Sequence, residues 1–206
     1  MRQILIGILT LISIEVIPQL PNTPPPLIKL SDLEIKFNDI VIFLKESDKP
    51  STLKDTAELY LDLGETIQGQ TFEIVNSGLR DIKVEQQYET SLSISKEGPH
   101  LDLMDWKHHT SNWAELTPVD EDKYTAIRYS SADQEKFPDF TEKELIEYLI
   151  SINHQEWANL IRAPSDRVER KHWWIGLSRV TIRISGFDKS NNWVTRYINI
   201  EIPMGC

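Results

Sequence analysis

The sequence predicts a β-rich α+β fold, in which an antiparallel β-sandwich-like core carries one main helix at about residues 141–162. Three observations support this class. Several segments alternate apolar and polar residues, which is the period-two pattern of strands buried on one face. Turn residues recur at a spacing of roughly ten residues, which is typical of sandwiches. Strong helix-start signals occur in a single segment, which begins near Thr141.

Length and composition fit one globular domain, which we place at residues 27–206. With 206 residues and 40% hydrophobic content, the chain can bury one core but is short for two full domains. The net charge of −10 argues against nucleic-acid binding, because clustered Lys and Arg carry phosphate affinity. Cys206 is the single cysteine, so neither an intramolecular disulfide nor a cysteine-based metal site can form.

Residues 1–26 form a separate region, an apolar segment followed by a proline-rich linker. The apolar run at residues 4–14 is too short for a bilayer, which takes about 20 residues, but it has the length of a signal-peptide core. Glu15 follows the run directly and no small-residue cleavage site is present, so a buried β-branched strand is the alternative. We expect no stable membrane span. The protein is periplasmic if the segment is a signal peptide and cytoplasmic otherwise.

The first half of the domain is a series of predicted strands. Alternation of apolar and polar residues predicts strands at residues 33–37 and 57–63. A continuous apolar run predicts a further strand at residues 40–44, and residues 71–75 are expected to form another short strand. Turn residues separate them, and Asn76-Ser77-Gly78 leads the chain into the longest strand.

That longest strand opens the stretch at residues 81–113, around which the domain is organised. Apolar side chains occupy its even positions, at Ile82, Val84, Tyr88, Leu92 and Ile94. A strand of this length exceeds the usual five or six residues, so we expect it to bend or bulge near Gln86-Gln87. It ends before Gly98-Pro99.

The second half of the domain contains the helix and a hairpin. Two strands at residues 113–116 and 124–129 are joined by the acidic loop at residues 117–123. Thr141 and Glu144 then form a capping box, and Phe140 and Leu145 form a hydrophobic staple.

The main helix that starts there continues at helical spacing to residue 162, with Asn153-His154 as a point of interruption. Alternation over residues 180–184 and 194–202, with a turn at residues 186–192, predicts a C-terminal hairpin of two long strands.

The chemistry-bearing side chains gather after the longest strand. Residue types that suit a divalent metal occur at His100, Asp102, Asp105, His108 and His109. Their spacing matches no closed metal template, and adjacent histidines on a strand point to opposite faces. The chain also lacks a nucleophile elbow and a phosphate-binding glycine loop. We therefore expect no catalytic residues, no metal and no cofactor, and a metal-dependent hydrolase is the less favoured alternative.

Charge and tryptophans indicate a protein-binding surface. Residues 96–147 hold 13 acidic and 6 basic residues, whereas residues 160–206 hold 4 acidic and 8 basic residues. Two solvated faces that attract each other within the fold explain this division most simply. An acidic loop can also attract a basic partner. The predicted partner-binding residues are Asp120, Glu121, Asp122, His108, His109 and Trp173. Residues 171–174 are the expected exposed set, with one of the two tryptophans turned to the core.

The block GPHLDLMDWKHHTSNW, together with the acidic and motif-poor character of the chain, resembles small bacterial immunity proteins of toxin secretion systems. The resemblance implies a non-enzymatic inhibitor that binds a basic cognate toxin and blocks its active site. It carries no individual site residue onto this chain. An envelope accessory or carbohydrate-binding β-sandwich module is the alternative, which exposed tryptophans would favour.

Overall fold

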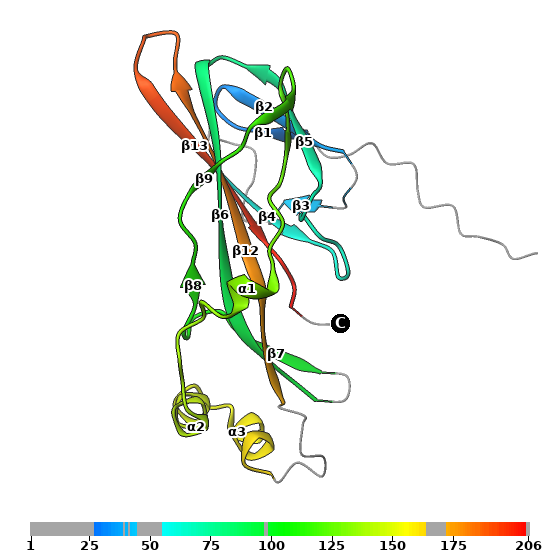
Figure 1. The fold of residues 1–206 in the computed structure, drawn as a ribbon, viewed down its shortest axis with the longest axis vertical. Coiled ribbons are helices and arrows are strands. Elements are labelled where there is room, and N and C mark those ends of the chain that lie inside the picture. Colours follow the sequence, from blue (N-terminus) through cyan, green and yellow to red (C-terminus); the bar gives the residue numbers. More distant parts are fainter. Residues whose placement is uncertain are drawn as a thin grey trace, which may run out of the picture.

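The β-rich prediction is confirmed by the computed structural model, in which two mostly antiparallel sheets pack together (Figure 1). The structure describes residues 27–38, 40, 42–44, 55–96, 99–163 and 172–204. The predicted N-terminal segment, its linker and Cys206 lie outside the described residues.

The smaller sheet has five strands in the order β1-β2-β5-β11-β10. Its strands are β1 (Leu27–Lys29), β2 (Leu33–Phe37), β5 (Thr71–Ser77), β11 (Lys123–Thr125) and β10 (Pro118–Asp120). All its neighbouring strands are antiparallel. Because β10 ends the order, one side of this strand has no partner among the strands that the structure describes.

The larger sheet follows the order β3-β4-β13-β12-β6-β7. Its strands are β3 (Ile42–Leu44), β4 (Thr56–Leu61), β13 (Trp193–Glu201), β12 (Trp173–Phe187), β6 (Arg80–Ser95) and β7 (His100–Leu103). Two short strands, β8 (His109–Thr110) and β9 (Ala114–Glu115), also pair with β6. The predicted C-terminal hairpin is confirmed as β12 and β13, whereas β4 and β13 run parallel.

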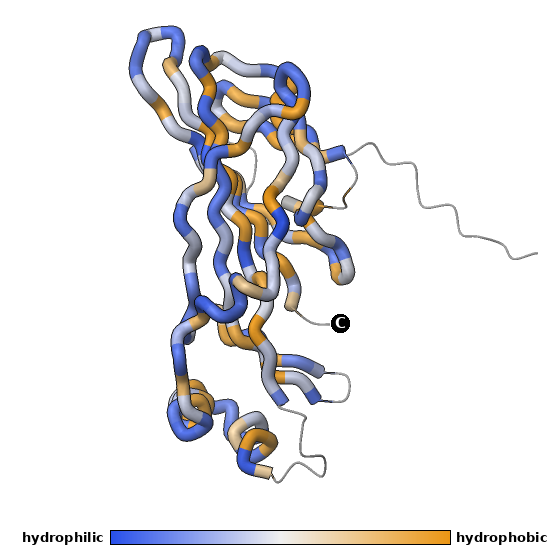
Figure 2. The backbone as a smooth tube through the Cα atoms, in the orientation of Figure 1, coloured by the Kyte–Doolittle hydropathy of each residue, from blue (hydrophilic) through white to orange (hydrophobic). Residues whose placement is uncertain are grey.

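Two hydrophobic cores lie along the same long strands. The first fills the space between the two sheets and includes Phe37, Phe72 and Ile182. The second lies against the other end of β6 and β12, where helices replace the small sheet, and includes Leu92 and Leu149. In Figure 2, hydrophobic and hydrophilic residues alternate along these strands, as expected for strands covered on one face.

The irregularity predicted near Gln86-Gln87 of the longest strand, β6, is not found there, because these residues pair in regular register with Ile182 and Thr181. The register between β6 and β12 shifts instead between Leu177 and Arg179 and between Ser185 and Phe187. Leu177 pairs with Thr90 and Arg179 pairs with Glu89, so Ser178 of β12 is the extra residue of a bulge. A bulge shifts the side-chain alternation by one residue. It therefore lets the odd-numbered apolar residues before Ser178 and the even-numbered ones after it face the same side of the sheet.

The main helix predicted at residues 141–162 is divided into two helices, and the division lies at the predicted point of interruption, Asn153-His154. Its start is confirmed, because Glu144 N donates to Thr141 Oγ1 at 3.2 Å and Thr141 N donates to Glu144 Oε2 at 2.7 Å. However, α2 (Glu142–Ser151) ends before Asn153, which has a φ of 61° in the left-handed region. A second helix, α3 (Gln155–Arg162), then begins.

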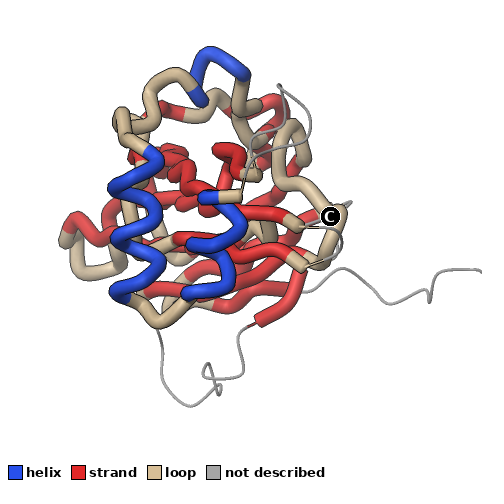
Figure 3. The backbone as a smooth tube through the Cα atoms, turned by 90° about the horizontal axis from the view of Figure 1, so that it is seen from below, coloured by secondary structure: helices blue, strands red, loops and turns tan. Residues whose placement is uncertain are grey.

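The three helices of the described residues lie at one end of the molecule and beside the long strands. Figure 3 shows α2 and α3 side by side across the end of the long strands. The short α1 (Ser131–Gln134), which the sequence analysis missed, lies beside β6 farther up. Within the described part of the chain, no helix has the length and apolarity needed to cross a bilayer.

Candidate functional site

The predicted acidic loop is a β-hairpin at the edge of the small sheet. Pro118 pairs with Tyr124 and Asp120 pairs with Lys123, so β10 occupies part of the segment that was predicted to be a loop. On its other side, β11 pairs with β5, which fixes the hairpin to the sandwich. The backbone N–H of Ile74 donates to the carbonyl of Asp122 at 2.9 Å and fixes the tip as well.

The three predicted acidic residues are exposed at this tip. Asp120, Glu121 and Asp122 form no ion pair with any residue that the structure describes. Beside them, Val119 is 61% exposed, which is the highest value for a large hydrophobic side chain in the described ranges. We call Val119 and these three acidic residues the acidic tip.

The basic C-terminal strands do not neutralise this tip. Arg179 pairs with Glu89 at 3.2 Å, and Arg183 pairs with Glu85 at 2.7 Å. In the ranges that the structure covers, no ion pair joins a base of residues 160–206 to an acid of residues 96–147. The expected attraction between the two regions is therefore not made by direct contacts there, and the acidic tip keeps its negative charge.

The predicted histidines lie in the other sheet. His109 of β8 pairs with Thr90 of β6, and its ring is tilted against Tyr88 with ring centroids 6.3 Å apart. His108 is exposed, whereas His109 is half-buried. The structure therefore does not bring these two histidines into one cluster with the acidic tip.

The two adjacent tryptophans face opposite sides of the large sheet, as predicted. Trp173 is the inward one: it packs in the helical core, with its ring centroid 4.7 Å from that of Phe140. It is therefore a poor candidate for partner contact. Trp174 is 40% exposed and lies over Gly176, where an added Cβ would meet the indole ring. Because adjacent strand residues face opposite sides of a sheet, one tryptophan had to face outward. The sequence did not determine which of the two it was.

Two further members of the predicted histidine cluster, His100 and Asp102, form a small polar group on β7, whereas Asp105 is exposed in the turn that follows. Asp102 accepts a hydrogen bond from Ser93 Oγ at 2.7 Å, and His100 Nε2 lies 3.6 Å from the other carboxylate oxygen. Among the described residues, no three His, Cys, Asp or Glu side chains gather in a way that could hold a metal ion.

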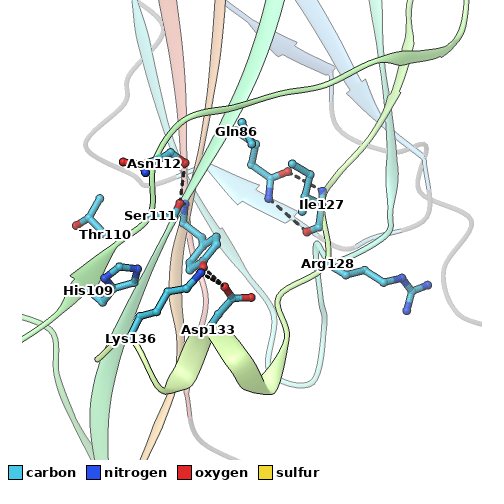
Figure 4. Close-up of a pocket in the computed structure, with 11 residues that line it drawn as sticks. Gln86, His109, Thr110, Ser111, Asn112, Ile127, Arg128, Asp133 and Lys136 are labelled. Carbon is cyan, nitrogen blue, oxygen red and sulfur yellow. Dashed lines mark hydrogen bonds and ion pairs between the residues drawn. The ribbon is translucent and has the colours of Figure 1, made fainter. Parts of the chain in front are cut away.

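A polar pocket of about 380 Å³ lies beside β8 (Figure 4). Its walls come from β6, from the segment that contains β8 and β9, and from α1 and the residues flanking it. The lining residues are Gln86, Tyr88, His109, Thr110, Ser111, Asn112, Ala114, Ile127, Arg128, Asp133 and Lys136. Gln86 links two of these walls, since its side-chain amide accepts from the N–H of Ile127 at 2.8 Å and donates to the carbonyl of the same residue at 3.3 Å.

A short hydrogen-bond chain crosses the lower part of this pocket. The Tyr88 hydroxyl donates to Asp133 Oδ1 at 2.5 Å, and Lys136 Nζ donates to the same oxygen at 2.7 Å. The hydrogen bond from Lys136 and that from Tyr88 hold the pKa of Asp133 well below its usual range. Burial and the Asp133 carboxylate raise the pKa of Tyr88. Burial, and then Asp133, raise the pKa of Tyr129 to about 12.

These shifts predict a loss of stability at both ends of the pH range. Because folding lowers the pKa of Asp133, its contribution is present above the unfolded pKa of about 3.9 and is lost as the pH falls toward the folded value. Because folding raises the pKa of Tyr129 to about 12, its contribution is present below the unfolded pKa of about 10 and is lost as the pH rises between these values. Denaturant unfolding measured across the pH range tests both slopes.

Two variants distinguish the contributions of Asp133 and Tyr129 to the pH dependence of stability. Asp133→Asn is expected to flatten the acid slope and to reduce the alkaline slope only in part, because burial, the largest cause of the raised pKa of Tyr129, remains. Tyr129→Phe is expected to reduce the alkaline slope alone. An Asp133→Asn protein with an unchanged acid slope would show that other carboxylates control acid unfolding.

Comparisons with known proteins do not assign this chain to a family. No family model matches the chain, and neither a curated protein nor a solved structure matches it.

Proposed function

We propose that this protein is a non-enzymatic inhibitor that binds a basic protein through the acidic tip of the β10–β11 hairpin. One observation carries the proposal: three exposed carboxylates without ion-pair partners among the described residues directly follow the exposed Val119 in a hairpin on a sheet edge. Unpaired charges accelerate encounter with an oppositely charged surface. A central apolar side chain gains contact area once water is excluded from it.

A secreted toxin is the partner class that fits this surface and the resemblance to immunity proteins. A toxin with a basic active cleft would offer the complementary charge, and a narrow hairpin can enter a cleft that a flat face cannot. The hairpin is also held by hydrogen bonds to β5, so little ordering is needed on binding. In this proposal, inhibition results from occupation of the cleft and requires no chemistry from this chain.

Neutralising the acidic tip is expected to slow association with the partner by about tenfold at low ionic strength, because rim charges act mainly on encounter. The test variant combines Asp120→Asn, Glu121→Gln and Asp122→Asn. The partner is first captured from source cells on the wild-type protein, and association rates are then measured at several salt concentrations. The difference in association rate between the variant and the wild type should become smaller as salt screens the charges.

A matched variant removes the same number of charges elsewhere. Glu135→Gln, Glu142→Gln and Glu156→Gln change exposed side chains near the helices and should leave the association rate nearly unchanged. Equal rates for both variants would refute the placement of the contact surface. A partner whose activity continues when it is bound would refute inhibition, and turnover that depends on Asp102 or His109 would refute the non-enzymatic class.

A further inference from the structure

The six tryptophans of the chain divide equally between the helical core and the opposite side of the large sheet. The first group packs in the helical core and consists of Trp106, Trp157 and Trp173. The second group lies on the side of β12 and β13 that faces away from both cores, which we call the outer face. These outer tryptophans are Trp113, Trp174 and Trp193. Since Trp174 is 40% and Trp193 is 52% exposed, packing in a core does not explain the second group.

Two of the outer tryptophans lie across the surface of the sheet. The Trp113 ring is stacked on the guanidinium of Arg183, with 4.1 Å between the Arg183 Cζ and the ring centroid. Trp174 lies over Gly176, where only a glycine leaves room for the indole ring. Because these contacts already hold the rings in place, little side-chain entropy would be lost when a ligand binds to them.

The outer tryptophans form a row along β12, which runs most of the length of the molecule (Figure 1). Trp174 belongs to this strand, and Trp113 reaches it at Arg183. Trp193 packs against Phe187 near the other end of the strand, with ring centroids 5.0 Å apart. At about 3.3 Å per strand residue, the distance from Trp174 to Phe187 is roughly 40 Å. A row of this length fits an extended ligand, because several weak ring contacts to one chain reinforce each other.

The charged side chains between these rings are paired with one another. Arg183 and Lys83 both pair with Glu85, at 2.7 and 3.1 Å. Arg179 pairs with Glu89 at 3.2 Å. A face whose charges are paired attracts a charged polymer only weakly, and the net charge of −10 repels an anionic one. The ligand that complements this face is therefore uncharged.

Uncharged polar side chains on the outer face supply hydrogen-bonding groups. Thr181 Oγ1 donates to Asn199 Oδ1 at 3.0 Å, and the hydroxyls of Ser185 and Thr195 lie 3.1 Å apart. Each of these groups keeps further donor or acceptor capacity. Sugar rings have apolar C–H faces that pack on aromatic rings, and hydroxyls at their edges that bind such polar groups. We propose that the outer face binds an extended, uncharged polysaccharide, with sugar rings against the outer tryptophans.

Native gel electrophoresis in gels that contain a soluble polysaccharide tests the proposal, because a bound polymer retards the protein. The uncharged probes are hydroxyethyl cellulose, galactomannan and glycol chitin, and carboxymethyl cellulose is the anionic counterpart of the first. At least one uncharged polymer is expected to retard the wild type, and carboxymethyl cellulose is expected to retard it less, because the acidic protein repels this polymer. Absence of retardation by all three uncharged polymers, or strongest retardation by carboxymethyl cellulose, would overturn the proposal.

Variants of the outer tryptophans locate the binding. Trp174→Ala and Trp193→Ala should each raise the apparent dissociation constant by about fivefold, and the double variant should raise it by at least about tenfold. Circular dichroism checks that each variant is folded. Ile150→Ala is the matched control, because Ile150 has the same exposed fraction as Trp174, 40%, but lies on α2. Unchanged binding by the double variant would refute the placement on the outer face.

A further comparison separates this proposal from the proposed inhibitor function. The acidic-tip variant should bind the polysaccharide like the wild type, since the tip belongs to the other sheet. If the double tryptophan variant instead slowed association with the protein partner and left polysaccharide binding unchanged, the outer face would be a protein-binding surface and the proposal would be wrong.

Discussion

Ile182→Ala is expected to lower the free energy of unfolding by about 2–5 kcal/mol, which is among the largest effects available to one substitution in this chain. Ile182 lies in the middle of β12, is fully buried, and packs between the two sheets. Its removal leaves a cavity in the sandwich core, because strands on both sides, β6 and β13, hold the backbone in place. Denaturant unfolding followed by circular dichroism measures the loss.

The helical core should respond in the same way. Leu149 on α2 is also fully buried, so Leu149→Ala is expected to cost a similar amount, about 2–5 kcal/mol. Since β6 and β12 run through both cores, we expect each variant to unfold in a single transition rather than one core at a time.

Val119→Ala is the control, because Val119 is 61% exposed and its truncation should change stability by no more than about 0.5 kcal/mol. Two separate transitions in the Leu149→Ala protein, seen as different midpoints by tryptophan fluorescence and circular dichroism, would show that the helical end folds independently.

The alternation in the sequence predicted the strands well because one face of each long strand is covered. The same pattern of apolar residues also contained a signal for the bulge at Ser178. Before it, Trp173 and Ile175 are apolar at odd positions, and after it, Val180 and Ile182 are apolar at even positions. This change of parity requires an extra residue between them if all are to face the core, and the bulge supplies it. The pattern of β6 itself keeps its apolar residues at even positions throughout, so it contains no signal for a bulge in its partner β12.

The start of the helix and its interruption at Asn153-His154 were both predicted from local residues, but the separation into two packed helices depends on the tertiary structure. The capping box of Thr141 and Glu144 is a local signal and was read directly. The break depends on Asn153 in the left-handed region, which asparagine tolerates but does not require. Burial of Leu149 and Ala158 in one core favours the turn between the helices, and only the tertiary structure shows that packing.

The candidate functional residues also fall into a group that the sequence predicts and a group that only the structure shows. The acidic tip is contiguous in sequence, so its charge was evident before the structure. The pocket is not contiguous: Tyr88 comes from β6, His109 from β8 and Asp133 from α1, and no spacing rule connects them. Lys136 beside Asp133 was visible only as one more pair of surface charges. A carboxylate that accepts from both a tyrosine and a lysine is recognised only after the walls are assembled.

Arg196→Met is expected to lower the free energy of unfolding by about 2–4 kcal/mol, because it breaks the ion pair that joins the two sheets. Arg196 lies in the inward-facing row of β13 with Ile198, and 10% of its side chain is exposed. Its guanidinium donates to both carboxylate oxygens of Asp32, at 2.8 and 3.0 Å, and Asp32 belongs to the turn between β1 and β2. Methionine would fill part of the space but leave Asp32, whose side chain is 22% exposed, without its main partner.

The neighbouring Asp55 supplies the control for this prediction. It also contacts Arg196, at 3.2 Å, but its side chain is 67% exposed, so Asp55→Asn should cost no more than about 1 kcal/mol. A double-mutant cycle with Asp32→Ala then measures the coupling directly, and the pair should lose less than the sum of its single variants, since each single variant leaves one charge unpaired. If Arg196→Met and Asp55→Asn proved equally mild, the two sheets would be held by their hydrophobic core alone, and the inward arginine would need another explanation.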